Sequence, residues 1–216
     1  MKGAPVAADE RDPTTGATGD RTDAAPRAAV GRHDDPQSPW RTLAAREVYR
    51  NPWISVTEYQ VVRPDGQPGI YGVVDPGDNA AIVALDAQQR VTLVGEFLYP
   101  LQVYAWMIPS GFVERGEDPL LAARRELAEE TGLEADEWAP LGAYYLSSGI
   151  STQTSYAYLA RGLRSVPARP EGTERLTLRS VPLAEAHRMC LRNEIRDAPS
   201  VMALWRAWEL LRDEGA

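Results

Sequence analysis

The sequence predicts an α/β domain, and three observations support that class. Runs rich in β-branched and aromatic residues recur along residues 53–181. One helical segment with a clear start and stop interrupts these runs, and two amphipathic helical segments follow them. Strands that share a chain with helices in this way are typical of layered α/β domains.

The first 38 residues differ in composition from the rest of the chain. They contain no Leu, Ile, Phe, Trp or Tyr, but they carry several prolines. Such a segment cannot bury enough apolar surface to offset the entropy of the chain. We therefore expect a disordered extension over residues 1–38, more consistent with an inert or solubilising role than with a partner-binding arm, and a folded domain over residues 39–214.

Strand patterns follow one another from Trp53 onwards. The expected strands cover residues 53–62, 70–74, 80–85, 91–97, 140–146, 155–160 and 176–181. A turn rich in Gly and Pro joins the first two, which predicts an antiparallel hairpin. The strands expected at residues 80–85 and 91–97 predict a second unit of two strands joined by a turn.

Two helical patterns are expected after the strands, at residues 183–192 and 199–212. The apolar spacing of the second helix favours Trp205 and Trp208 as core residues rather than as a ligand platform. Cys190 is the only cysteine, so it cannot form an internal disulfide. Its apolar neighbours predict a buried thiol rather than a nucleophile.

The helix in the middle of the chain has the strongest local signals. Asp118 is a plausible N-cap, and Pro119 suits the first helical position because it lacks a donor that would have no partner there. Gly132 can adopt the left-handed conformation that ends a helix. We expect this helix to cover residues 118–131.

Three glutamates share one face of the expected helix. Glu126, Glu129 and Glu130 stand at i, i+3 and i+4, so their like charges repel one another. A solvated acidic face is the ordinary explanation for such a cluster. The alternative is a site for a hard cation, because Mg²⁺ binds through a few carboxylates, waters and phosphate oxygens.

Further fixed positions favour the cation site. The spacing Gly-x5-Glu-x7-Arg-Glu-aliphatic-x-Glu-Glu-x-Gly-aliphatic resembles the Nudix box at all nine defined positions, which are Gly111, Glu117, Arg125, Glu126, Leu127, Glu129, Glu130, Gly132 and Leu133. The resemblance implies an α/β/α sandwich with a mixed central sheet, an N-terminal antiparallel hairpin and C-terminal helices. It also implies hydrolysis of nucleoside diphosphates linked to another moiety, with Mg²⁺ or Mn²⁺ as cofactor.

The resemblance also implies roles for individual residues. Glu126 and Glu130 would be the principal metal ligands, Glu129 a further ligand or the general base, and the carbonyl of Ser110 or Gly111 another ligand. The residues that would support the geometry of loop and helix are Glu117, Arg125 and Gly132. The catalytic candidates are Glu129, Glu126 and Arg125.

Segments outside the box resemble the ADP-ribose pyrophosphatase branch of the family. They include the Tyr99-Pro100 step and residues 146–153, and the resemblance covers nearly all of residues 40–212. It implies a nucleotide-sugar substrate, with AMP and ribose 5-phosphate as the products of ADP-ribose. It also implies a homodimer whose N-terminal strands reach the partner. The candidate substrate contacts are Gln153, Tyr99 and Ser148.

The chain departs from that branch at Ser148, which replaces a frequent proline, at Leu98, which replaces a frequent arginine, and at Gln153, which replaces a glutamate base. A glutamine cannot accept a proton near neutral pH, and no Asp or Glu occurs between Glu137 and Glu171. Glu129 would then act as base, or metal ions would activate water without a strong base. The alternative is a nucleotide-binding Nudix domain with weak or no hydrolysis, acting as a sensor or interaction module.

Composition restricts the other partners. The net charge is −8 and the only lysine is Lys2, which argues against a nucleic-acid partner. No apolar run is long enough for a membrane span, and the N-terminus has no signal-peptide pattern, so we expect a cytoplasmic protein. The candidates for adenine stacking, most of which we expect in the core, are Trp53, Tyr71, Tyr99, Tyr104 and Phe112.

Overall fold

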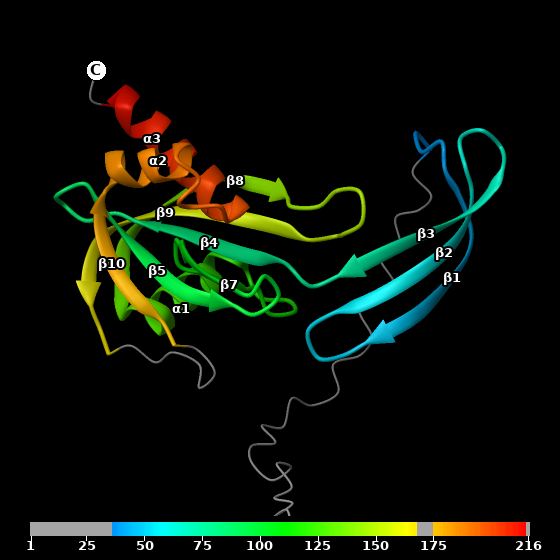
Figure 1. Ribbon diagram of the computed structural model, residues 1–216, viewed down its shortest axis with the longest axis horizontal. Coiled ribbons are helices and arrows are strands. Elements are labelled where there is room, and N and C mark those ends of the chain that lie inside the picture. The colour runs from blue at the N-terminus through cyan, green and yellow to red at the C-terminus, as the bar shows by residue number, and fades with distance from the viewer. Residues whose placement is uncertain (1–35, 168–174, 215–216) are drawn as a thin grey trace, which may run out of the picture.

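The structure is a computed structural model, and it describes residues 36–167 and 175–214. The described residues form a body of two sheets and three helices. Figure 1 shows a separate sheet extending from one end of this body. Most of the expected extension at residues 1–38 lies outside the described residues.

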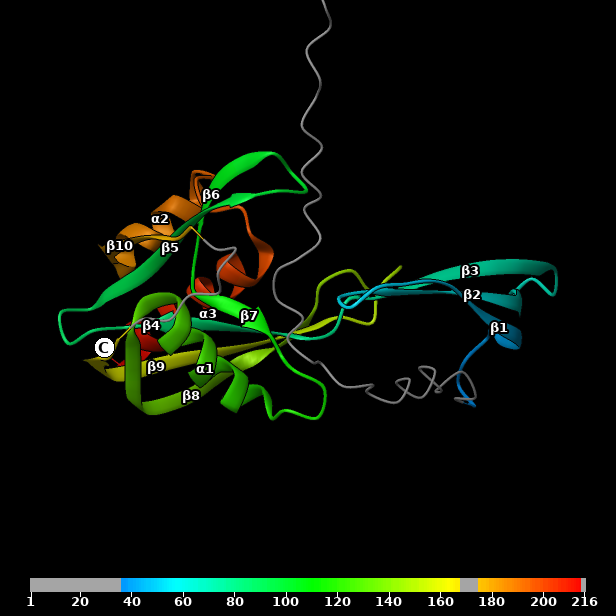
Figure 2. The ribbon, with the colours of Figure 1, turned by 90° about the horizontal axis from the view of Figure 1, so that it is seen from below.

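The extending sheet contains β1 (Arg41–Arg50), β2 (Ser55–Val62) and β3 (Pro68–Asp75), paired antiparallel in the order β1-β2-β3. The predicted hairpin is confirmed as β2 and β3. Strand β1 was missed, because nearly every residue in it is exposed and its sequence shows no alternation of apolar and polar residues. Figures 1 and 2 both show this sheet standing away from the body.

The central sheet of the body has the order β7-β4-β9-β8. It contains β4 (Asn79–Ala84), β7 (Ser110–Phe112), β8 (Leu133–Tyr145) and β9 (Thr154–Ser165). Strands β4 and β9 pair in parallel, whereas β4 with β7 and β8 with β9 pair antiparallel. The sheet is therefore mixed, as predicted.

A second sheet in the body contains β5 (Arg90–Leu98), β6 (Val103–Met107) and β10 (Thr177–Pro182), in the order β10-β5-β6. The second predicted unit of two strands and a turn is present as β4 and β5, but these two strands belong to different sheets. An isolated bridge between Leu85 and Val91 joins them at the turn. Residues 80–84 of β4 are all fully buried, so this strand lies between layers rather than in a surface hairpin.

The three helices are α1 (Pro119–Thr131), α2 (Leu183–Leu191) and α3 (Ala198–Glu214). Helix α1 packs on the face of β4 that carries Ala80, Ile82 and Ala84. The opposite face of β4, with Val83, packs in the core that contains residues of α2, α3 and the second sheet. These layers form the predicted α/β/α sandwich. No helix among the described residues is both long and apolar enough to cross a membrane.

The C-terminal helices confirm the core predictions for Cys190 and Trp208 and correct the one for Trp205. Cys190 is buried, and its burial raises the pKa of the thiol to about 11. Trp208 packs against the core and stacks on His187, with ring centroids 5.1 Å apart. The prediction for Trp205 was wrong, because this residue is 41% exposed and meets His187 at an angle. The buried stripe of α3 is narrower than the apolar pattern suggested.

Candidate active site

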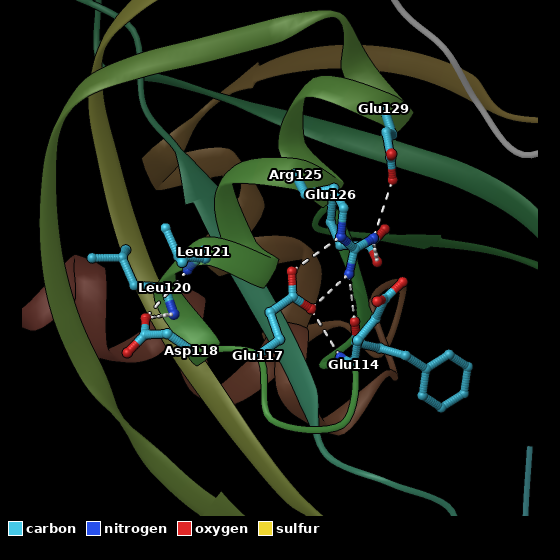
Figure 3. Close-up of polar contacts among 9 residues, drawn as sticks. Glu114, Glu117, Asp118, Leu120, Leu121, Arg125, Glu126 and Glu129 are labelled. Carbon is cyan, nitrogen blue, oxygen red and sulfur yellow. Dashed lines mark hydrogen bonds and ion pairs between the residues drawn. The ribbon is translucent and has the colours of Figure 1, made fainter. Parts of the chain in front are cut away.

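The caps of α1 set the position of the glutamate face. Asp118 has an extended backbone, and its carboxylate accepts hydrogen bonds from the backbone N–H groups of Leu120 and Leu121 at 2.9 and 3.3 Å (Figure 3). Gly132 ends the helix in the left-handed region with φ of 65°. Both predicted caps are confirmed, and the helix begins within one residue of the predicted start.

Arg125 joins the loop before α1 to the helix itself. Figure 3 shows its guanidinium at the centre of the cluster. It donates to both carboxylate oxygens of Glu117, at 3.2 and 3.1 Å, and to the backbone carbonyl of Phe112 at 2.8 Å. It also donates to Glu126 at 2.6 Å and to Glu129 at 3.1 Å. One side chain thus fixes both ends of the box relative to each other.

The hydrogen bonds and ion pairs of this cluster shift the pKa values of Arg125 and Glu117. Burial lowers the pKa of Arg125, but the hydrogen bonds with Glu117 and Glu126 outweigh burial and raise it above its ordinary value. The hydrogen bond with Arg125 lowers the pKa of Glu117. Glu117 also accepts from the backbone N–H of Glu114 at 2.8 Å, which closes the loop before the helix. The pair therefore stays ionised at neutral pH.

Strand β7 lies directly against the glutamate face. A carboxylate oxygen of Glu130 accepts a hydrogen bond from the backbone N–H of Ser110 at 3.1 Å. The carboxylate of Glu126 occupies the space beside Gly111, where an added Cβ would lie 2.0 Å from Glu126 Cδ. The first box position must therefore be glycine for Glu126 to keep this place.

The donor set fits a hard divalent cation. Arg125 contacts two of the three carboxylates on the glutamate face, and every candidate donor is an oxygen. Within the described residues, no three or more Asp, Glu, His or Cys side chains are grouped so that they could hold a metal ion. Arg125 donates hydrogen bonds to Glu126 and Glu129, so a cation would have to compete with the guanidinium for those oxygens.

Gln153 lies at the same end of the central sheet as the box loop. Asn79 at the start of β4 pairs with Phe112 on one side and with Ser155 on the other, and Gln153 immediately precedes β9. Tyr99 lies in the turn between β5 and β6 and is 81% exposed. In the described part of the chain, no hydrogen bond or ring contact joins Tyr99 or the exposed Ser148 to the box side chains.

The expectation that most of the aromatic candidates belong to the core was wrong. Trp53, Tyr104 and Phe112 are more than half exposed, as is Tyr99. Tyr71 is partly buried and meets the ring of Trp40 edge-on, at a centroid distance of 5.5 Å. Its hydroxyl reaches the loop before β9, a contact that no local sequence signal indicated.

Two family models divide the folded chain between them. One, described as the NUDIX domain, matches residues 75–204 and so covers the box and the body as far as the first part of α3. The other, described as the nucleoside diphosphate sugar hydrolase N-terminal domain, matches residues 40–74 and so covers the extending sheet. The boundary between the two matches falls at the end of β3.

Individual relatives agree with these matches. An ADP-ribose pyrophosphatase of Mycobacterium tuberculosis is 33% identical over 72% of this chain and 77% of its own length. An ADP-ribose pyrophosphatase of Bacillus subtilis is 27% identical over 76% of this chain and 90% of its own. A solved structure of an ADP compounds hydrolase superposes with a TM-score of 0.74 at 22% identity, covering 82% of this chain and 96% of the other. By its box, its fold and these matches, the chain belongs to the Nudix family.

Proposed function

We propose that this Nudix hydrolase cleaves the pyrophosphate of ADP-ribose, or of a closely related nucleotide sugar, to release AMP and ribose 5-phosphate. Nudix hydrolases generally need divalent cations, and we propose Mg²⁺ as the cation, with Mn²⁺ as a substitute. One observation carries the proposal: α1 and β7 set the Glu126 and Glu130 side chains against the backbone of Gly111 and Ser110. The relatives named ADP-ribose pyrophosphatase support the choice of substrate.

The roles of the residues follow from this geometry. Glu126 and Glu130, with a backbone carbonyl of Ser110 or Gly111, would hold the cation. When bound, a divalent cation neutralises the pyrophosphate and lowers the pKa of water. Arg125 holds the loop and the helix in register through Glu117. We propose Glu129 as the general base, because it is the most exposed of the carboxylates that Arg125 contacts, with 35% of its side chain accessible.

We also propose that the enzyme is a homodimer formed through the extending sheet. Exposed apolar side chains lie on this sheet and its turns, at Leu43, Val48, Tyr49, Trp53 and Ile70. Exposed apolar side chains on one sheet are typical of protein–protein interfaces, so a second copy of the chain would cover them.

Metal removal and product identification test the function. We expect the purified protein to release AMP and ribose 5-phosphate from ADP-ribose in Mg²⁺, and to lose at least about 10³-fold of that rate when the cation is chelated, because the cation supplies several kcal/mol of charge stabilisation. A panel of nucleotide sugars, assayed in Mg²⁺ and in Mn²⁺, would rank the substrates. The proposal fails if correctly folded protein turns over none of them.

Gln153 supports a second candidate, a nucleotide-binding domain that hydrolyses its ligand weakly. A carboxylate at this end of the sheet could act as a base, and a positioned base contributes about 10²- to 10⁴-fold to a rate. If the native site is attenuated, we expect Gln153→Glu to raise kcat for ADP-ribose at least about tenfold. A lower rate with unchanged substrate binding would instead assign Gln153 its own role in a competent enzyme. Gln88→Glu, in the exposed turn at the other end of β4, is the matched control.

A further inference from the structure

The loop that carries Gln153 is fastened to the extending sheet through its backbone. This loop, residues 146–153, joins β8 to β9 and lies beside the end of β3 (Figures 1 and 2). The backbone N–H of Val74 donates to the carbonyl of Ile150 at 2.8 Å, and the N–H of Thr152 donates to the carbonyl of Val74 at 3.1 Å. Val74 and Ser151 thus form a parallel bridge.

Two side chains of β3 strengthen the same attachment. The hydroxyl of Tyr71 donates to the carbonyl of Gly149 at 2.7 Å. The hydroxyl of Thr152 donates to the carboxylate of Asp75 at 3.0 Å. The Tyr71 ring also meets the ring of Trp40 edge-on. The loop is therefore held at several points by a strand that belongs to another sheet.

A further residue joins the end of this loop to the box. The carboxylate of Asp78 accepts a hydrogen bond from the backbone N–H of Thr154 at 3.0 Å. The backbone carbonyl of Asp78 accepts from the N–H of Val113 at 3.0 Å. Asp78 thus lies between the residue after Gln153 and the second residue after Gly111. A chain of hydrogen bonds thus leads from β3 through residues 146–153 and Asp78 to Val113, in the loop before α1.

We propose that Tyr71 and Asp75 are positioning residues, which hold residues 146–153 so that Gln153 stays fixed relative to the metal-binding face. This inference rests on the proposed function. Tyr71 contacts the loop rather than the box, so its effect passes through the loop. Misplacing a group in an active site by about 1 Å can cost up to about 10²-fold in rate, and backbone anchors of this kind prevent such shifts. The extending sheet then contributes to catalysis as well as to the proposed dimer.

Tyr71→Phe tests the proposal, because it removes the hydroxyl and keeps the ring. We expect kcat for ADP-ribose to fall about 3- to 10-fold, the range for one lost hydrogen bond. The Mg²⁺ concentration for half-maximal activity should not change, since the proposed metal ligands lie on β7 and α1. Amide hydrogen exchange of residues 146–153 should become at least about threefold faster. Tyr49→Phe is the control, because it removes a hydroxyl from the extending sheet that accepts from the Asn51 side chain, in the turn after β1, and it keeps the exposed ring.

Tyr71→Phe in a Gln153→Ala background tests whether the loss of kcat comes from misplaced Gln153 or from a loss of activity unrelated to Gln153. If Tyr71 acts through Gln153, its effect on kcat disappears in that background. An equal loss in both backgrounds, or unchanged loop exchange in Tyr71→Phe, would overturn the proposal. Thr152→Val, which removes the bond to Asp75, gives an independent second variant. Exchange needs no substrate, so it still decides the anchoring if ADP-ribose is not hydrolysed and the proposed function fails.

Discussion

We expect Glu126→Gln to lower kcat/KM for ADP-ribose by about 10³-fold or more, while the protein stays folded. The substitution removes one charged oxygen from the proposed metal site and changes almost nothing in side-chain volume. Cation binding contributes several kcal/mol of transition-state stabilisation, and each 1.36 kcal/mol is worth tenfold in rate. The lost ion pair with Arg125 should change the free energy of unfolding by only about 1 kcal/mol, because the amide oxygen can still accept a hydrogen bond.

The measurements are steady-state kinetics over a range of Mg²⁺ concentrations and thermal unfolding of the same samples. Glu134→Gln is the control, since Glu134 lies just beyond α1 and pairs with Arg164 at the surface. It should leave both activity and stability close to those of the parent. Full activity of Glu126→Gln at ordinary Mg²⁺ concentrations would remove Glu126 from the metal site, and a large loss of stability would reassign it to a structural role.

The sequence could predict the box helix well because its signals are local. Asp118, Pro119 and Gly132 each act within one turn of the helix end, so their effect does not depend on the rest of the fold. The spacing of the glutamates then fixes their common face. The layered α/β architecture was equally accessible, since it follows from the order of strands and helices and from the resemblance that the box carries.

Features that depend on distant contacts could not be predicted in this way. Strand β1 has no alternating pattern, because its neighbours on the sheet rather than a buried face determine its position. The attachment of residues 146–153 to Tyr71 joins segments 78 residues apart. Trp205 has the spacing of a core residue, but its exposure depends on how wide a stripe of α3 the sheet can cover. All three features are set by tertiary packing, which local sequence signals do not encode.

We expect Gly111→Ala to lower kcat/KM for ADP-ribose by about 10²-fold or more at little cost in stability. An added Cβ would lie 2.0 Å from Glu126 Cδ and 2.3 Å from both carboxylate oxygens of Glu126, so that carboxylate must move away from β7. The obstacle is the far end of a flexible side chain, which can rotate without disturbing the strand. The free energy of unfolding should therefore change by less than about 1 kcal/mol, the more so because alanine restricts the unfolded chain more than glycine does.

The contrast between Gly111→Ala and Gly72→Ala isolates the displaced carboxylate. Gly72 lies on β3 with no atom within 4 Å of an added Cβ, so its substitution should leave kcat/KM unchanged. In a Glu126→Gln background, Gly111→Ala should cost almost nothing more, since the two changes remove the same interaction and such effects are not additive. Additive losses would mean that Gly111 acts on the reaction independently of Glu126, for example through its own carbonyl. A loss of several kcal/mol in stability would mean that β7 itself, rather than the Glu126 side chain, moves to make room.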